Sequence, residues 1–368
     1  MGAGRLDRRG VMAGAGALLL ARGAGAQRGA GQGAWLRGAD LPFAVQEIYP
    51  AVFRGQIVQA GGFRQRAGPI IWPTTSVIGF EGGQWRALVD LPERRHHLML
   101  VAEAGEGRLL AIGGFSSEPG AIWRGQREVW TLSSPDGRWE RAPALPSPQA
   151  ESAAGSFPGR VVLAGGRSPS GTANSGYGDH GDTGRTLILR DGARGWVEGA
   201  AMPTPRNSMA FAVLSGRLHV IAGRRSLGPG NIVNLADHHA YDPDADRWTA
   251  LAPLPAPRGG HAAAVVGGRI HVLGGEAFGD SPTVFREHWS YDAEADRWRE
   301  ELPMPEGRHG LGVVALEGRL HVIGGASQPG GRGTSARHDI YALPATGAAL
   351  VPQPKMKPRT AAISSGWA

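Results

Sequence analysis

The amino-acid sequence predicts an all-β fold in which six copies of one unit pack radially, as the blades of a propeller. First, a Gly-Gly or Ala-Gly pair follows an apolar run six times along the chain. Second, a Trp precedes each pair, by 26 residues in five copies and by 28 in the second. Third, a Leu-Pro or Met-Pro pair falls six and seven residues after each Trp. Sixfold coincidence at three positions indicates a repeat architecture.

The recurring pieces predict about four short strands in each unit. The apolar runs before the Gly pairs, such as residues 269–273 and 319–323, are short and β-branched, as in buried strands. Tyr241-Asp242 and Tyr291-Asp292 each lie seven residues before a Trp and indicate a strand that enters a turn. One four-stranded sheet of this size cannot bury both faces, whereas radial packing of several sheets can.

The composition excludes several classes of protein. The 368 residues include 59 Gly, 27 Pro and no Cys, while 41% apolar residues supply a core. The absence of Cys excludes disulfides, Cys-ligated zinc, iron–sulfur clusters and thiol nucleophiles. The net charge of +7 suggests a polyanion partner, but 37 of the 39 basic residues are Arg, which a coding bias explains more simply. We therefore expect no nucleic-acid partner.

The two ends of the chain lie outside the repeat. Residues 1–26 combine a basic start, an apolar stretch of 11 residues and a small-x-small site before Gln27, which predicts an export signal. Because a membrane-spanning helix needs about 20 apolar residues, we expect no stable membrane insertion. Arg8-Arg9 resembles a twin-arginine signal, with an ordinary Sec signal as the alternative. Both predict a periplasmic or secreted protein, and residues 344–368 are interpreted as a C-terminal tail.

The unit resembles the kelch repeat. Its order is apolar run, Gly pair, variable loop, Tyr-Asp-Pro, Trp and Leu-Pro-x-Pro-Arg, and residues 241–275 match nearly throughout. The resemblance covers about residues 35–343, although copy three has Leu189 in the Tyr slot and copy four has Ala222 in place of the first Gly. It implies a six-bladed propeller over residues 27–343. The strand around Trp35 is expected to pair with the C-terminal strands near Tyr341 and so to close the ring.

Candidate site residues are found where the copies differ, at the start of the innermost strand. Glu47, His97 and Glu151 stand 12 residues after the Trp of the first three copies and depart from the family pattern. Carboxylates and imidazoles move protons, so these three are the predicted catalytic residues. Arginines ten residues after the Trp of the last three copies lie opposite and are suited to hold a carboxylate or phosphate. The predicted substrate-binding residues are Arg95, His96, Gln149, Arg206, Asn207, Arg258, His261, Arg308 and His309.

Two further patterns favour structural interpretations. His219, His271 and His321 share one slot of the repeat, which suggests a three-histidine metal site, but the repeat places them in separate sheets. Asp179 and Asp182, in the long segment 167–185, suggest calcium, but the full series of ligands is absent and a rim loop is favoured. We therefore predict no metal and no cofactor.

Two classes of function remain open from the sequence. The resemblance to exported bacterial six-bladed kelch proteins, among them the sialic-acid mutarotase group, implies a small acidic carbohydrate as ligand and an acid–base isomerase as the enzyme, if there is one. The alternative is a non-catalytic module that binds a glycan, a peptide or an envelope protein, because a fold alone does not set function. A copper-radical oxidase of the galactose oxidase kind is excluded, since its cofactor needs a Tyr cross-linked to Cys.

Overall fold

The structure is a computed structural model that describes residues 33–65, 71–105, 107–118, 121–228, 231–279 and 281–344. These residues belong to one compact unit, Gly31–Ala368. The predicted export signal, residues 1–26, lies outside the described residues, as does the predicted tail beyond residue 344. Within the described ranges, no helix is long and apolar enough to cross a membrane.

The described part of the chain contains 34 strands and one 3₁₀ helix, η1 (Tyr177–Asp179), which confirms the all-β prediction. Most strands belong to four-stranded antiparallel sheets whose members, apart from the first strand of the chain, are paired in chain order, with strands of smaller sheets between some of them in sequence. Tight turns join many of them. For example, Gly267 and Gly268 have φ of 58° and 74° and connect two strands as a two-residue hairpin, a conformation that glycine adopts without steric cost.

Six four-stranded sheets follow one another along the described residues. The first contains β3 (Ala51–Phe53), β4 (Gln56–Ala60), β7 (Val77–Glu81) and β8 (Gln84–Ala87). The second contains β10 (Met99–Ala102), β11 (Leu109–Ile112), β14 (Val129–Leu132) and β15 (Glu140–Ala142). The third contains β16 (Ala153–Phe157), β17 (Arg160–Ala164), β20 (Thr186–Arg190) and β21 (Val197–Gly199).

The remaining three sheets repeat this order. The fourth contains β22 (Ala210–Leu214), β23 (Arg217–Ser226), β24 (Ile232–Asp242) and β25 (Arg247–Leu251). The fifth contains β26 (Ala262–Val266), β27 (Arg269–Leu273), β30 (His288–Asp292) and β31 (Arg297–Glu300). The sixth contains β32 (Gly312–Leu316), β33 (Arg319–Ile323), β34 (His338–Ala342) and, as its outer strand, β1 (Ala34–Arg37).

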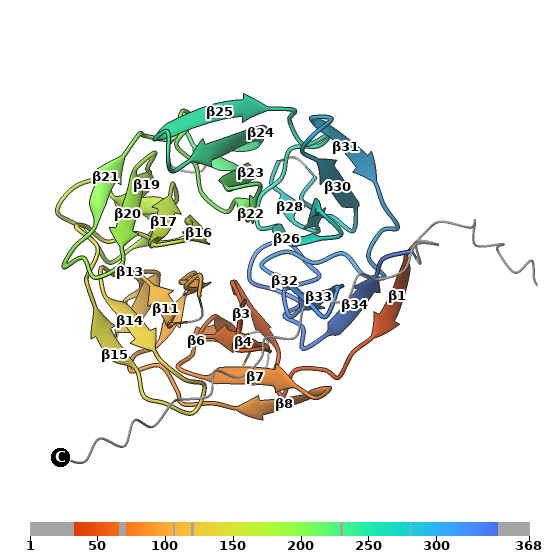
Figure 1. Ribbon diagram of the computed structural model, residues 1–368, viewed down its shortest axis with the longest axis horizontal. Helices are drawn as coiled ribbons and strands as arrows, with labels where there is room; N and C mark the ends of the chain where they lie inside the picture. The colour runs from red at the N-terminus through yellow and green to blue at the C-terminus, as the bar shows by residue number, and fades with distance from the viewer. Residues whose placement is uncertain are drawn as a thin grey trace, which may run out of the picture. The chain divides into compact units, whose positions relative to one another are not determined.

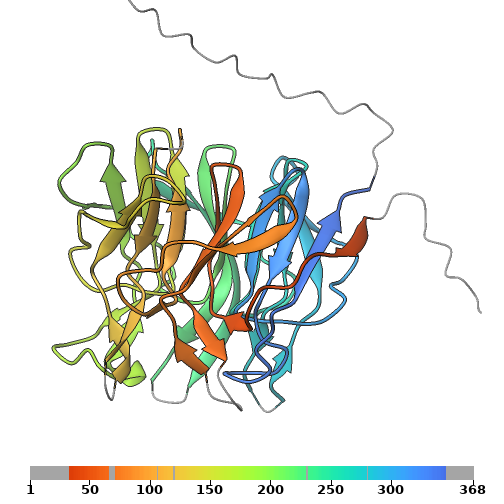
Figure 2. The ribbon, with the colours of Figure 1, turned by 90° about the horizontal axis from the view of Figure 1, so that it is seen from below.

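The sheets are arranged around a common centre, with the first strand of each sheet innermost and the last strand outermost (Figure 1). Seen from the side, the connections gather at two opposite faces (Figure 2). The core is divided into hydrophobic clusters that lie between consecutive sheets, such as Ile221 of the fourth sheet with Val272 of the fifth. A cluster that contains Ile57 and Ile323 joins the sixth sheet to the first.

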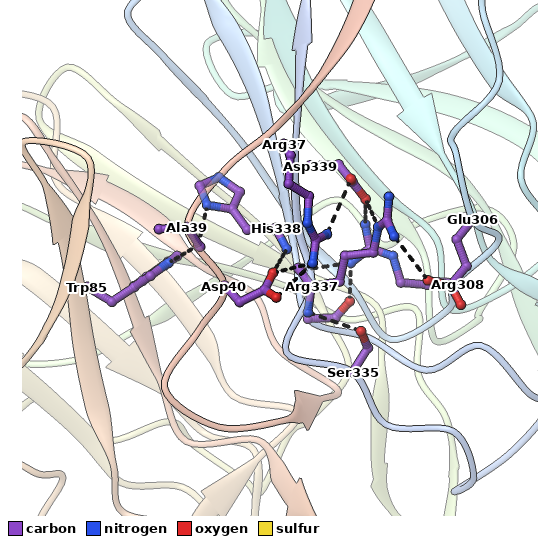
Figure 3. A network of polar contacts seen from close by, with 11 residues as sticks. Arg37, Ala39, Asp40, Trp85, Glu306, Arg308, Ser335, Arg337, His338 and Asp339 are labelled. Atoms are coloured by element: carbon purple, nitrogen blue, oxygen red, sulfur yellow. Dashed lines mark hydrogen bonds and ion pairs between the residues drawn. The ribbon is translucent and has the colours of Figure 1, made fainter.

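The outermost strand of the sixth sheet comes from the other end of the described chain. β1 is antiparallel to β34 with Trp35 opposite Tyr341. A polar network surrounds this junction (Figure 3): the Asp339 carboxylate accepts hydrogen bonds from Arg308 Nη2 at 2.7 Å and from Arg337 Nε at 2.6 Å, and Arg37 lies 3.5 Å away. His338 Nδ1 and Trp85 Nε1 both lie within hydrogen-bond distance of the Ala39 carbonyl.

The recurring Trp residues join neighbouring units. Each indole N–H donates a hydrogen bond of 2.8–3.2 Å to a backbone carbonyl of the adjacent unit, the donors being Trp35, Trp85, Trp139, Trp196, Trp248 and Trp298. Each Trp thus contributes both apolar contact area and a hydrogen bond at the boundary between two units.

Four smaller sheets lie next to the candidate site described below. They contain β2 (Val45–Gln46), β5 (Phe63–Gln65) and β6 (Ile71–Pro73); β9 (Arg95–His96), β12 (Phe115–Glu118) and β13 (Ala121–Gly125); β18 (Arg167–Pro169) and β19 (His180–Asp182); and β28 (Glu276–Ala277) and β29 (Thr283–Val284). Each uses the segment directly after a Gly pair, which is thereby placed beside the segment that follows the Leu-Pro pair.

Candidate ligand site at the centre of the sheets

Six equivalent positions, 12 residues after each Trp, form a backbone ring around the centre. All six have positive φ: Glu47 (56°), His97 (53°), Glu151 (54°), Ser208 (52°), Gly260 (65°) and Gly310 (56°). Five of the six neighbouring pairs are linked by N–H to carbonyl hydrogen bonds, including one of 2.7 Å from Glu47 to Gly310 that joins the first and last units, while Ser208 and Glu151 are joined through their side chains. Each of the four non-glycine members costs about 1–2 kcal/mol in this conformation. Such strain is typical of functional positions, where the side chain is needed.

The four side chains of this ring line a cavity of about 290 Å³. These side chains and other charged and polar residues form the floor of the cavity, and aromatic and aliphatic residues form its walls. The lining consists of Gln46, Glu47, Phe63, Ile71, His97, Trp123, Glu151, Tyr177, Ser208, Arg224, Ile232, Glu276, Phe278, Gly330 and Gly331.

The three predicted catalytic residues come together at the floor. His97 Nε2 lies 3.0 Å from Glu47 Oε2 and 3.9 Å from Glu151 Oε1. Ser208 donates a hydrogen bond of 2.9 Å from its hydroxyl to Glu151 Oε2. An imidazole between two carboxylates is an arrangement that can accept and release protons.

The electrostatics of the floor set different charges on its groups. Burial opposes ionisation of Glu47, but the charge and hydrogen bond of His97 outweigh it and lower the pKa of Glu47 to about 2. Burial also opposes the charged form of His97, yet Glu47 and Glu151 outweigh it and raise the pKa of His97. At neutral pH Glu47 is therefore an acceptor only, and the two carboxylates favour the protonated form of His97.

A second pair of charges, Arg224 and Glu276, was not predicted from the sequence. Arg224 Nη2 contacts Glu276 Oε1 at 2.6 Å, and His309 Nδ1 lies 3.2 Å from the same oxygen and 3.6 Å from Glu47 Oε1. Both residues come directly after a Gly-Gly or Ala-Gly pair, and this slot holds four residue types among the six copies: Phe63, Phe115, Arg167, Arg224, Glu276 and Ala326. That variability was the signal that would have found them.

Aromatic side chains form the wall beside His97 and were also missed. Phe63 stacks on His96 with ring centroids 3.9 Å apart, and Trp123 meets Tyr177 edge-on at 4.9 Å. Burial, with a smaller contribution from Glu151, raises the pKa of Tyr177 to about 12, so its phenol stays protonated. Trp123 and Tyr177 lie in segments that match no repeat position, which is why the repeat pattern did not single them out.

The arginines predicted to anchor a ligand lie elsewhere. The guanidinium groups of Arg95, Arg206, Arg258 and Arg308 are buried within the units and donate hydrogen bonds of 2.6–3.2 Å to backbone carbonyls within or directly after the second strand of a sheet. Gln149 does the same with Gly165 at 2.7 Å. None of these five described residues lines the cavity. The expectation is therefore corrected: this position satisfies buried carbonyls, for which a long donor side chain is suited.

The other predicted binding residues support the floor from outside the cavity. His96 lies behind His97, with 2.6 Å between their Nδ1 atoms, and His309 contacts Glu47 and Glu276. Asn207 donates to Asp182 Oδ1 at 2.5 Å, and His261 Nε2 lies 3.0 Å from the Ile221 carbonyl. These residues are buried and do not line the cavity.

The two patterns interpreted as structural have structural partners. The three histidines of the shared slot pair with a second histidine each, as His219 with His238, His271 with His288 and His321 with His338, at nitrogen distances of 2.8–3.0 Å. Asp179 accepts from the backbone N–H groups of Ser175 and Gly176. Across the described ranges, no group of three or more His, Asp or Glu residues is arranged to hold a metal ion.

The fold and the site together define an all-β repeat protein with a polar, aromatic-walled cavity at the meeting point of its units. No family model matches the chain. It is 29% identical over 207 residues to Kelch-like protein 33 of Homo sapiens, which covers 50% of this chain and 36% of that protein. Kelch-like protein terF of Aspergillus terreus is 25% identical over 259 residues, 68% of this chain and 54% of that protein. Kelch-like ECH-associated protein 1A of Danio rerio is 32% identical over 80 residues, 22% and 13% of the two chains.

The chain spans about half or less of the length of these relatives. Each of these relatives carries the word kelch in its name. The sequence of the present chain itself repeats the Gly pair, the Trp and the Leu-Pro or Met-Pro pair six times. With the all-β fold, the similarities support a kelch-repeat protein.

Proposed function

We propose that this chain is a six-bladed propeller, closed by β1, whose central cavity binds a small, hydroxyl-rich carbohydrate. Three features support the architecture: six four-stranded sheets in sequence order, a hydrophobic cluster between the sixth sheet and the first, and the hydrogen bond from Glu47 to Gly310. The observation that carries the ligand class is the combination of carboxylates at the floor with an aromatic wall. Sugar hydroxyls donate to carboxylates, while the C–H face of a sugar ring packs on an aromatic ring.

The charge of the cavity favours a neutral sugar over the acidic one expected from the sequence. Glu47, Glu151 and Glu276 contribute three negative charges, against which stand Arg224 and the imidazolium of His97. The one guanidinium in the lining, that of Arg224, is already paired with Glu276 at 2.6 Å. A ligand carboxylate would therefore meet more negative than positive charge, whereas hydroxyl groups find acceptors on both sides of His97.

The same floor is suited to acid–base isomerisation at the anomeric carbon. In this reaction Glu151 takes the proton of the anomeric hydroxyl while His97 gives its Nε2 proton to the ring oxygen, and the bond between the anomeric carbon and that oxygen breaks. The product is the open-chain aldehyde. Rotation about the bond between the aldehyde carbon and the next carbon presents the other face of the carbonyl, and the reverse transfers then close the other anomer and return both protons, so that no cofactor is consumed.

A non-catalytic protein-binding module is the second candidate. Two exposed apolar side chains favour it: Leu227, 55% exposed, and Val233, 38% exposed, follow or belong to the long strands β23 and β24. Ile232 of the same hairpin lines the cavity. The name of one relative describes association with another protein. A peptide that inserts one side chain into the cavity would cover these residues.

A binding and exchange experiment separates the two candidates. The purified chain is titrated calorimetrically with neutral and acidic monosaccharides, and NMR follows the exchange between anomers of each sugar that binds. We expect binding of neutral sugars, lost in Glu47→Gln and kept in the matched control Glu81→Gln, since Glu81 is exposed on β7. Binding without faster exchange restricts the function to recognition, and an absence of sugar binding rejects the carbohydrate proposal.

We also propose that residues 1–26 direct export. The basic start with Arg8-Arg9, the short apolar stretch and the small-x-small site support it. Fusion of these residues to a reporter protein, with the double change Arg8→Lys and Arg9→Lys as the test, measures the route. Export that persists in the double variant indicates a Sec signal, and a reporter retained in the cytoplasm in both versions contradicts the proposal.

A further inference from the structure

A chain of hydrogen-bond contacts runs from the backbone of the second unit to the floor of the cavity. His96 Nε2 lies 2.6 Å from the carbonyl oxygen of Ile122. His96 Nδ1 lies 2.6 Å from His97 Nδ1, and His97 Nε2 lies 3.0 Å from Glu47 Oε2. Three contacts therefore connect a carbonyl, two imidazoles and a carboxylate in series.

The two ends of this series fix where the protons are. A carbonyl oxygen only accepts, so the proton of the first contact is on His96 Nε2. The Glu47 carboxylate is ionised and likewise accepts, so His97 Nε2 carries a proton. One proton lies between the two Nδ1 atoms, and the imidazole that holds it is doubly protonated and cationic, while the other is neutral.

The surroundings of the two rings decide which one is cationic. His97 lies between Glu47 and Glu151, and the charge of Arg224 is the repulsive contribution on that side. His96 is fully buried, stacks on Phe63 at 3.9 Å and meets Trp123 edge-on at 4.9 Å. Burial and the neighbouring His97 lower the pKa of His96 well below its usual value. A cation is stabilised beside carboxylates, whereas a fully buried imidazole that contacts no carboxylate loses its hydration without that compensation.

We propose that His96 is a positioning residue that holds His97 as an imidazolium and directs its Nε2 proton toward the cavity. Neutral His96 accepts the Nδ1 proton of His97 and cannot pass it on, because its own Nε2 proton is bound to the Ile122 carbonyl. The proton that His97 is free to release is thus the one on Nε2, beside Glu47 and Glu151. This role toward a ligand rests on the proposed function, whereas the charge of His97 does not.

The side chains that resemble either half of His96 provide a matched pair of variants. His96→Asn places an amide oxygen near the position of Nδ1 and keeps an acceptor for His97. His96→Gln places its amide nitrogen near the position of Nε2, so that it keeps a donor to Ile122 and lacks the acceptor. Both variants remove the imidazole, so a purely structural role of His96 predicts the same result for the two.

The experiment is NMR of the ring nitrogens in the ¹⁵N-histidine-labelled protein without ligand, followed from pH 5 to pH 9. We expect His97 to carry protons on both nitrogens at pH 7 in the wild type. A hydrogen bond to a charged group contributes enough to shift its titration by about 1–2 pH units. The midpoint of His97 should therefore fall by that amount in His96→Gln and by much less in His96→Asn.

Three outcomes would overturn the inference: a neutral His97 in the wild type at pH 7, a doubly protonated His96, or equal shifts in the two variants. The wild-type spectra decide the first two even if a variant does not fold. Because no sugar is present, failure here is distinguishable from failure of the carbohydrate proposal, which leaves the ring protonation intact.

Discussion

Replacement of Gly310 by Ala tests whether the central ring and the charged floor are one structural unit. Gly310 has φ of 56°, and a Cβ atom at this position would lie 2.7 Å from Glu47 Oε1 and 3.0 Å from the backbone nitrogen of Glu47. Real Cβ atoms do not approach other atoms this closely, so the Glu47 carboxylate has to move. It would then leave the position in which it contacts His97 at 3.0 Å.

Gly260 supplies the matched control. Its φ is 65°, but a Cβ atom there would meet Arg224 Nη2 at 3.2 Å and a backbone atom no closer than 3.6 Å. Gly260→Ala therefore pays the conformational cost of about 1–2 kcal/mol and little else. Gly310→Ala adds the loss of a charge-assisted hydrogen bond in a buried site, which contributes about 1.5–3 kcal/mol.

The assay is urea-induced unfolding of the two variants and the wild type at pH 7, followed by tryptophan fluorescence. We expect Gly310→Ala to lower the free energy of unfolding by at least about 1 kcal/mol more than Gly260→Ala does. We also expect the His97 titration midpoint to fall in Gly310→Ala alone. Equal losses of stability in the two variants would refute the reasoning, because they would mean that the contact between Gly310 and Glu47 has no energetic role.

Three other predictions concern the scaffold. Burial lowers the pKa of His271 to about 4 and of His288 to about 3, below the unfolded value near 6.5. The unfolded chain therefore binds more protons in this range, and the free energy of unfolding should decrease as the pH falls from about 6.5 toward 4. A free energy of unfolding that stays constant over this range, measured by urea unfolding, would contradict this prediction. Trp298→Phe removes the 2.8 Å hydrogen bond to Ala252 and should cost about 0.5–1.5 kcal/mol in the same assay, so an unchanged midpoint would show that the bond contributes nothing. Arg258→Met should lower stability without changing sugar affinity, in contrast to Glu151→Gln, and a selective loss of affinity in Arg258→Met would return the arginines to the site.

The strands and their order were predictable because each unit buries the same pattern. A run such as residues 319–323 becomes β33, and its Gly pair follows directly. The recurring Trp marks the repeat for the same reason, since every copy repeats the same hydrogen bond to a carbonyl of its neighbour. A single apolar run is weak evidence for a strand, but six equivalent runs together are strong evidence. The strands of the scaffold are therefore the part of the structure that the sequence predicts best.

The site was predictable only where the repeat itself exposed it. Glu47, His97 and Glu151 stand at a position that is Gly in the last two copies, and the structure shows positive φ at all of these residues. The charge of the arginines was misleading about their role. An Arg in the sequence does not indicate whether a ligand or a backbone carbonyl, such as that of Gly274, accepts its hydrogen bonds. Arg224 and Trp123 depend on how the segments after the Gly pairs fold back over the centre, which no local pattern specifies.

The position of the non-glycine residues in the ring explains how a symmetric scaffold supports an asymmetric site. If all six members were glycine, the ring would have the least strain and no chemistry at its centre. Four consecutive units accept a side chain at about 1–2 kcal/mol each, while Gly260 and Gly310 leave room for Arg224 and for the Glu47 carboxylate. Gly310 is therefore part of the site, because a side chain in the sixth unit would occupy the space that the Glu47 carboxylate of the first unit needs.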